Sequence, residues 1–234
     1  MGRNSAILFT VLAILHSLGT QGRTQSSATH GDLSIPMYSC RAEADVVFVI
    51  DSSTSISPDN FRKMLTVAAT ITSSLRIGRD GIRVAMVMFS DEGKTVFNLN
   101  SYYDPTLIRL AMISSKYLGG NTYLDRGLTA AYNLLSPIGG GRLKAIKTVL
   151  VMTDGRYSNP ERTYQVAELL YKNNVKVIGV GIGPDASDEE LMKLTRDCNL
   201  IFKATSFDAA HSSLSSLMLK TCEVIKGIQV PEEP

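Results

Sequence analysis

The sequence contains no tryptophan, only three cysteines and three histidines, and no dense run of charges of one sign. Its 24 lysine and arginine residues nearly balance 22 aspartate and glutamate residues, so the formal net charge is +2. Proteins that bind nucleic acid or anionic membranes mainly by electrostatics carry clustered basic residues. The balance therefore argues against both partners. The 234 residues, 44% of them hydrophobic, suffice for one sizeable core but are few for two ordinary domains.

The sequence also lacks the residue combinations on which common enzyme classes depend. The histidines are His16, His30 and His211, and the first two lie in the N-terminal region. No Gly-x-Ser-x-Gly element, dinucleotide-binding glycine fingerprint or phosphate-binding P-loop occurs. A phosphotransferase or hydrolase with Asp51 as nucleophile would need a nearby acid or base, but Ser53 follows two residues later instead of a second acid. We expect that the protein is not an enzyme.

Residues 1–22 have the three parts of a secretory signal peptide. Arg3 provides an early positive charge, residues 6–15 are almost entirely hydrophobic, and small and polar residues follow as far as Gly22. An uncleaved anchor is the alternative, but the run is shorter than the roughly 20 residues that span a bilayer. No other run is long enough, and the C-terminus lacks the hydrophobic tail of a lipid-anchor signal. We expect a secreted protein without a membrane span, located in the extracellular space or matrix.

The three cysteines lie at informative positions for an extracellular protein, in which disulfides can form. Cys40 precedes the first expected strand, and Cys222 ends the last helical stretch. If the fold brings its two ends together, a bridge between them would close nearly the whole domain into one loop. Cys198 is then left over, and we expect a buried free thiol there. A link to a second chain through Cys198, and hence an oligomer, is the less favoured alternative.

Short hydrophobic runs alternate with segments of helical spacing throughout the rest of the chain. Strands are expected at residues 46–50, 84–89, 94–99, 148–152 and 175–182, with a further covered strand entered at 197–202. Helices are expected at residues 58–75, 106–116, 124–135, 160–173, 187–195 and 207–219. The alternation predicts a Rossmann-like α/β fold, a doubly wound and mostly parallel sheet with helices on both faces. Residues 94–99 follow the second strand too closely for a helical crossover, so they should form an antiparallel edge strand.

Oxygen-bearing side chains follow the ends of the expected strands. Asp51 ends the first strand and is followed at alternate positions by Ser53 and Ser55, and Asp154 follows the strand at 148–152. A glycine turn before the helix at 124–135 presents Thr122. Ligands of open α/β sheets bind beyond the carboxyl ends of the strands, and carboxylates with hydroxyls are ligands for a hard cation, here Mg²⁺ or Mn²⁺. Each piece alone is also a common helix cap or turn.

In these segments the chain resembles the von Willebrand factor type A (VWA) domains of matrilins, collagen VI and integrins. The resemblance rests on residues 44–56, 119–122, 149–155 and 177–183. It implies a VWA domain at about 44–224, between a flexible lead-in at 23–43 and a short tail at 225–234. The resemblance also implies a metal-ion-dependent adhesion site, or MIDAS. Its metal ligands would be, directly or through water, Asp51, Ser53, Ser55, Thr122 and Asp154.

The resemblance implies a function as well as a fold. An acidic side chain of a protein partner completes the metal coordination in that family, so we expect an adhesion or matrix-assembly protein that binds a matrix protein, possibly a collagenous one. The alternative is a structural matrix component, of the kind found in invertebrate shell or byssal threads, that uses other surfaces while the metal is incidental. Around the expected site, Asn121 and residues 156–158 depart from the glycines that are common in the family.

Overall fold

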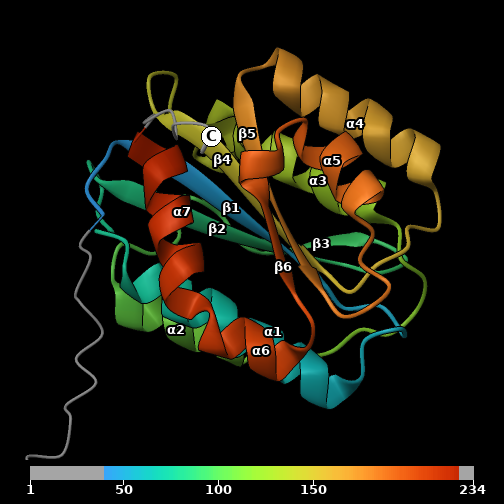
Figure 1. Cartoon of the computed structure of the whole chain (residues 1–234). Coiled ribbons are helices and arrows are strands. Elements are labelled where there is room, and N and C mark those ends of the chain that lie inside the picture. Colours follow the sequence, from blue (N-terminus) through green and yellow to red (C-terminus); the bar gives the residue numbers. More distant parts are fainter. Residues whose placement is uncertain (1–39, 227–234) are drawn as a thin grey trace, which may run out of the picture. The chain divides into compact units, whose positions relative to one another are not determined.

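The computed structural model describes residues 40–226, which form a central six-stranded sheet covered by helices (Figure 1). The expected signal peptide, most of the lead-in and most of the tail lie outside the described residues. The strands are β1 (Ala44–Asp51), β2 (Ile82–Phe89), β3 (Gly93–Phe97), β4 (Ile146–Thr153), β5 (Val175–Ile182) and β6 (Ile201–Ala204). Within residues 40–226, every helix is too short or too polar to cross a membrane.

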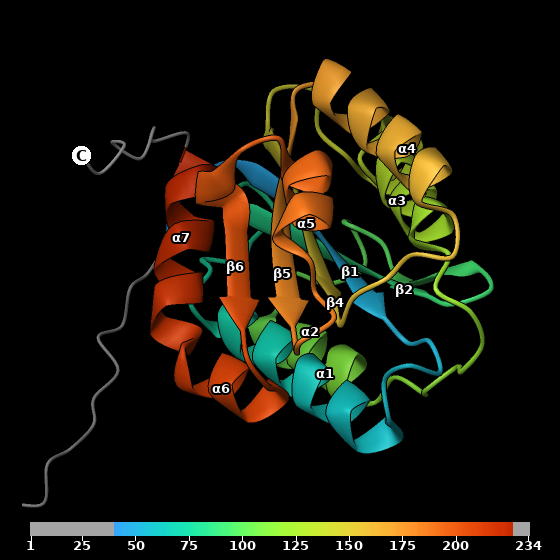
Figure 2. The same cartoon turned by 45° about the vertical axis from the view of Figure 1, so that its right-hand side comes forward.

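The sheet has the strand order β3-β2-β1-β4-β5-β6. All neighbours are parallel except β2 and β3, which pair as an antiparallel hairpin. Figure 2 shows β5 and β6 running in the same direction, with β6 at the sheet edge opposite β3. The predicted doubly wound fold with one antiparallel edge strand is therefore confirmed. The chain reverses its order between β1 and β4, which makes the carboxyl ends of these two central strands the place where a ligand is expected.

The helices divide into two layers, one on each face of the sheet (Figure 1). The helices α1 (Pro58–Ser73), α2 (Pro105–Ile113), α6 (Phe207–Ser212) and α7 (Leu214–Lys226) cover one face. The other face is covered by α3 (Leu124–Leu134), α4 (Pro160–Lys172) and α5 (Asp188–Thr195). Two short 3₁₀ turns are η1 (Pro137–Gly139) and η2 (Cys198–Leu200). The helix expected at 207–219 is thus two helices, broken at Ser213, and the second extends to Lys226.

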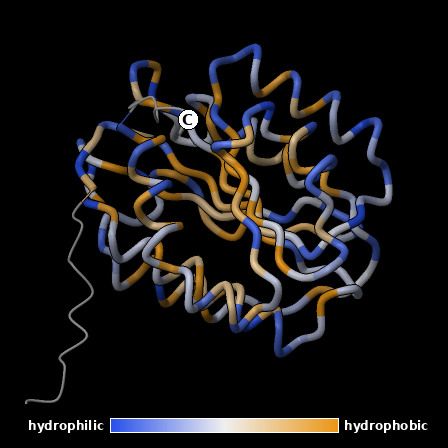
Figure 3. The backbone as a smooth tube through the Cα atoms, viewed as in Figure 1, coloured by the Kyte–Doolittle hydropathy of each residue, from blue (hydrophilic) through white to orange (hydrophobic). Residues whose placement is uncertain are grey.

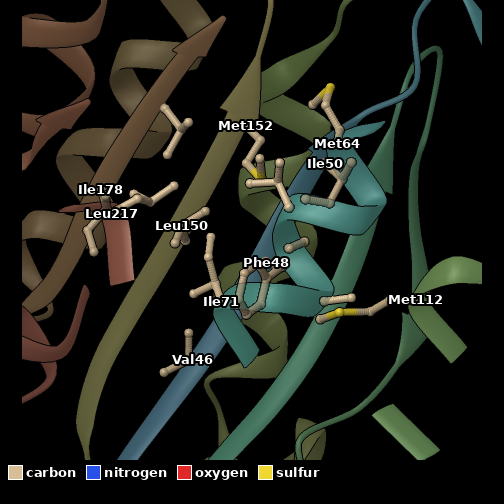
Figure 4. Packing of buried hydrophobic residues seen from close by; sticks show 14 of the residues in the cluster. Val46, Phe48, Ile50, Met64, Ile71, Met112, Leu150, Met152, Ile178 and Leu217 are labelled. Carbon is tan, nitrogen blue, oxygen red and sulfur yellow. The ribbon is translucent and has the colours of Figure 1, made fainter. Parts of the chain in front are cut away.

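The buried residues form one hydrophobic cluster on each face of the sheet. Alternate residues of β1 point to opposite faces, as strand geometry requires. Phe48 packs in the cluster beneath α1 and α7 (Figure 4), whereas Val47 and Val49 pack in the other cluster. Hydrophobic residues accordingly concentrate along the central strands (Figure 3). Burial on both faces explains why β1 and β4 read as continuous hydrophobic runs.

The amino-terminal edge of the sheet is closed by covalent and ionic contacts. A disulfide joins Cys40 to Cys222, with 5.5 Å between their Cα atoms. At the same end of the sheet, the fully buried Asp45 of β1 forms an ion pair with Arg142 at 2.7 Å and accepts a hydrogen bond from the Arg142 backbone N–H at 2.6 Å. The folded structure therefore already includes Cys40, ahead of the expected boundary at residue 44.

Cys198 corrects one expectation from the sequence. The thiol was expected to be buried at the entry to a covered strand, but Cys198 is exposed and free in η2. The strand β6 begins only at Ile201, three residues later, and it is an edge strand in which only Ala204 is buried, so it is not the covered strand that was expected. Of the three residues in this short 3₁₀ turn, only Leu200 belongs to a hydrophobic cluster. The hydrophobic pattern of 198–202 therefore comes from a turn followed by a strand that is shorter than expected.

Candidate metal centre

The two predicted acidic ligands lie at the carboxyl ends of neighbouring parallel strands. Asp51 is the last residue of β1 and is fully buried. Asp154 directly follows Thr153, the last residue of β4, and is partly exposed. Because β1 pairs with β4 in parallel register, both carboxylates reach the same edge of the sheet. Its burial suits Asp51 to a contact at the inner side of the candidate metal centre, and its partial exposure suits Asp154 to the solvent-facing rim of the centre.

A chain of hydrogen bonds links these two carboxylates through the loop that follows β1. The Ser53 N–H donates to Asp51 Oδ1 at 2.9 Å, which folds the loop back over the end of the strand. The hydroxyl oxygens of Ser53 and Ser55 lie 2.9 Å apart. Ser55 Oγ then donates to Asp154 Oδ1 at 3.0 Å. Four of the five predicted ligands therefore gather in one place, although they span more than a hundred residues of sequence.

Thr122 reaches the same edge through the glycine turn between α2 and α3. Gly119 and Gly120 have φ angles of 71° and 96°, which glycine adopts without strain. Gly120 is held to the β1 loop because its N–H donates to Thr54 Oγ1 at 2.8 Å, while its carbonyl accepts from the Thr54 N–H at 2.9 Å. The Thr122 N–H donates to Ser158 Oγ at 3.0 Å. Thr122 thus lies between the loops that carry the other predicted ligands.

Two supporting residues had not been assigned a role from the sequence. Thr153 Oγ1 donates to Asp51 Oδ2 at 2.8 Å, and this hydroxyl immediately before Asp154 was a visible signal. Asp91, in the β2–β3 hairpin, accepts hydrogen bonds from the backbone and side-chain N–H groups of Asn121 at 3.2 and 2.8 Å. A side chain at Gly120 would collide with the Asp91 carboxylate. No local pattern in the sequence predicts that Asp91 contacts this turn.

The electrostatics of the two carboxylates leave their negative charge uncompensated. Burial raises the pKa of Asp51 to about 6, against hydrogen bonds from Ser53 and Thr153 that favour the charged form. Burial also raises the pKa of Asp154, and the nearby Asp185 carboxylate adds to this. No basic side chain of residues 40–226 is among the groups that lower either pKa. A cation bound at this edge would compensate the negative charge of both carboxylates.

The donor set fits a hard divalent cation. Nowhere in residues 40–226 do three or more His, Cys, Asp or Glu side chains form a metal-binding group. The candidate centre instead combines the two carboxylates of Asp51 and Asp154 with the hydroxyls of Ser53 and Ser55. Oxygen-only donors favour Mg²⁺ or Mn²⁺ over metals that prefer sulfur or imidazole.

The structure defines the class of protein. It is an open, doubly wound α/β domain with an oxygen-lined site at the carboxyl ends of its strands. The family model for the von Willebrand factor type A domain matches residues 45–216, and the chain belongs to this family. The resemblance inferred from the sequence is therefore confirmed. The site residues lie at the end of β1 and on the loops after β1, before α3 and after β4.

Curated relatives include long matrix proteins. The chain is 31% identical over 196 residues to the collagen alpha-6(VI) chain of Mus musculus, which covers 82% of this chain and 8% of that one. It is 26% identical over 196 residues to von Willebrand factor A domain-containing protein 2 of Xenopus laevis, covering 83% and 24% of the two chains. This chain thus spans less than a tenth of the collagen relative.

Among solved structures, the chain is similar to proximal thread matrix protein 1 from the mussel byssus. The superposition has a TM-score of 0.73 at 27% identity and covers 79% of this chain and 48% of that chain. Another structure of the mussel protein, with a zinc-occupied MIDAS motif, has a TM-score of 0.72 at 26% identity and covers 79% and 47%. The mussel protein thus binds a metal in its MIDAS motif.

Proposed function

We propose that the protein is a secreted adhesion or matrix-assembly protein that binds an extracellular protein partner through a divalent cation. Asp51, Ser53, Ser55, Thr122 and Asp154 would hold the cation, and Mg²⁺ or Mn²⁺ is the ion that suits them. The observation that carries the proposal is the hydrogen-bonded path from Asp51 through Ser53 and Ser55 to Asp154, which ends in two carboxylates without a basic counterpart. No catalytic role is proposed for these residues.

The residues of the site have distinct roles in this proposal. A bound divalent cation supplies positive charge that can attract an acidic side chain of the partner. Asp51 and Asp154 provide only two negative charges, so the cation keeps part of its positive character. The hydroxyls of Ser53, Ser55 and Thr122 add oxygen donors without adding charge. Thr153 orients Asp51 through its hydrogen bond, and the Gly119–Gly120 turn positions Thr122.

The first experiment is a thermal melt of the protein in EDTA and in Mg²⁺, Mn²⁺, Ca²⁺ or Zn²⁺. At a hundred times the Kd, binding to the folded state contributes about 2.7 kcal/mol, which raises the Tm of a domain of this size by roughly 5 to 10 °C. The Asp154→Ala variant should lose the shift. The control Asp59→Ala removes an exposed carboxylate of α1 and should keep it. An equal shift in both variants would contradict the assignment of the site.

The second experiment measures binding to a panel of purified collagens immobilised on a surface, in Mg²⁺ and in EDTA. Metal-dependent binding that Asp154→Ala abolishes would support adhesion through the site. The similarity to the mussel thread matrix protein favours a second candidate function, a structural matrix component that uses other surfaces. In that case Asp154→Ala and EDTA would leave matrix binding unchanged.

A further inference from the structure

A depression of about 700 Å³ lies directly beside the candidate metal centre. Its walls come from residues 156–164, which lead into α4, and residues 184–193, which lead through α5. These two helices lie side by side on the same face of the sheet (Figures 1 and 2). We call this depression the α4–α5 basin. A partner bound at the metal centre would therefore lie within reach of the basin.

The basin and the metal centre share a boundary at Asp185. A Cβ atom at Gly155 would lie 2.9 Å from the Cβ atom of Asp185, so the backbone next to Asp154 touches the basin wall. The charge of Asp185 also contributes to the raised pKa of Asp154. Arg156, two residues after Asp154, lines the basin on the other loop. The basin is thus continuous with the rim of the metal centre.

Carboxylates outnumber bases in the basin by four to two. The carboxylates are those of Glu161, Asp185, Glu189 and Glu190, and the bases are Arg156 and Lys193. Lys193 is committed within the chain, because its Nζ atom lies 2.6 Å from Glu189 Oε1. Glu190 Oε2 is buried and has no hydrogen-bond partner in the described part of the chain. The basin therefore keeps an excess of two negative charges, and the exposed Arg156 is the only remaining basic residue among its lining residues.

An aromatic side chain suits the basin to a cation with a hydrophobic stem. Lys193 Nζ lies 5.6 Å from the centre of the Tyr164 ring, so this ring already faces a positive charge. Tyr164 is held edge-on by the buried Tyr157, with 6.4 Å between the ring centres. Pro160 and Pro184 supply further hydrophobic surface. Arginine and lysine side chains combine a hydrophobic stem with a charged end and match such a lining.

We propose that the α4–α5 basin binds an arginine or lysine side chain of the protein partner whose carboxylate reaches the metal centre. This inference rests on the proposed function and adds a specificity to it. The partner would be recognised by an acidic and a basic side chain close together, the first at the cation and the second in the basin. The exposed Asp185 would contact the positive charge directly, the less exposed Glu190 would attract it through its negative charge, and Tyr164 would contact the stem.

The test is an NMR titration of the full chain with N-acetyl-arginine methylamide in EDTA, up to tens of millimolar. Backbone amide signals of residues 156, 164, 187, 190 and 193 should shift and saturate together. The neutral probe N-acetyl-glutamine methylamide and the acidic probe N-acetyl-glutamate methylamide should leave them in place. No saturable shift with the arginine probe, or an equal shift with the acidic probe, would overturn the proposal.

Two variants with opposite expected effects separate a binding role from a structural one. The double variant Asp185→Asn and Glu190→Gln keeps the size of both side chains and should weaken the arginine probe at least threefold. Arg156→Gln removes the competing positive charge and should strengthen binding of the arginine probe severalfold. Unchanged affinity in both variants would contradict the proposed contacts.

A Mg²⁺ titration of the same samples distinguishes failure of the basin from failure of the metal centre. Mg²⁺ should shift the amide signals of Asp51, Ser53, Ser55 and Thr122, independently of the arginine probe. Shifts from Mg²⁺ without shifts from the arginine probe would refute the basin and leave the metal centre intact. Shifts from the probe alone would leave a cation-binding basin and refute the metal-dependent function on which its role depends.

Discussion

The two ends of strand β1 each bury an aspartate, and they treat its charge in opposite ways. Asp45, at the amino end, is fully buried and meets the guanidinium of Arg142, whose side chain is 14% exposed. Asp51, at the carboxyl end, is equally buried but is surrounded by hydroxyls and backbone N–H groups. The charge of Asp45 is neutralised by Arg142, while Asp51 has no basic side chain among the groups of residues 40–226 that lower its pKa.

This difference separates the part of the molecule that maintains the fold from the part that is available for binding. At the amino end, Arg142 also donates hydrogen bonds to the carbonyls of Ala44 and Gly81 at 2.7 and 2.9 Å, and the disulfide holds Cys40 shortly before β1 begins. At the carboxyl end, the loops are joined mainly by hydroxyl and backbone hydrogen bonds. We expect substitutions at the first end to change stability alone, and substitutions at the second to change metal binding.

The largest effect is expected from the double variant Cys40→Ser and Cys222→Ser. The bridge joins positions 182 residues apart, and the chain-entropy model assigns such a loop about 5 kcal/mol. Urea unfolding should show a loss of that order, with measured values for native bridges reaching down to about 2 kcal/mol. The Mg²⁺-induced increase in Tm should persist. A variant that retains full stability, or that loses the Mg²⁺ effect while folded, would break the separation of the two ends.

A slightly smaller loss is expected from Arg142→Met. Removing one partner of a buried ion pair leaves an uncompensated charge and typically destabilises a protein by about 3 to 5 kcal/mol. Adding Asp45→Leu should recover most of this loss, since a hydrophobic replacement of both partners is often neutral. The free energy of unfolding of the single and double variants measures the coupling. Equal stability of the two variants would show that Asp45 carries no buried charge.

In contrast to the previous two changes, Asp51→Asn should increase the stability of the metal-free protein, measured in EDTA. The pKa of Asp51 in the folded protein is raised to about 6 from 3.8, so the metal-free protein loses stability as the pH rises from about 4 through about 6. At pH 7.5 the variant should therefore be more stable than the parent by about 1 to 3 kcal/mol. The gain should vanish near pH 4, where the parent carboxyl is protonated. Thermal melts at both pH values, with and without Mg²⁺, test the sign.

Much of this arrangement could be predicted from the sequence because it depends on local patterns. The β-branched runs ending at Ile50 and Met152 predicted buried parallel strands, and parallel strands place their carboxyl ends together. The alternate spacing of Ser53 and Ser55 then predicted hydroxyls beside Asp51. The structure confirms the mostly parallel sheet with one antiparallel edge strand, and its hydrogen bonds bring these residues together.

Other features could not be predicted, because they depend on side chains that meet only after folding. Asp45 and Arg142 are 97 residues apart in loops and strand ends without a repeating pattern. The exposure of Cys198 depends on a 3₁₀ turn that replaces the first residues of an expected strand. The basin likewise combines charged residues of two segments that are distant in the sequence and come together only when α4 and α5 pack side by side.

The smallest effect is expected from Asp91→Ala, which tests how the turn with Thr122 is held. Asp91 accepts both hydrogen bonds from Asn121 and packs against Gly120, so its loss should loosen the turn without opening the core. Residues that orient metal ligands typically change metal affinity by about tenfold or more. The control Glu92→Ala removes the neighbouring exposed carboxylate, which pairs only with Arg126 among the described residues. Mg²⁺ titrations should show weaker binding in Asp91→Ala alone. Equal affinity in both variants would mean that the glycines and the contacts of Thr54 and Ser158 suffice to position Thr122.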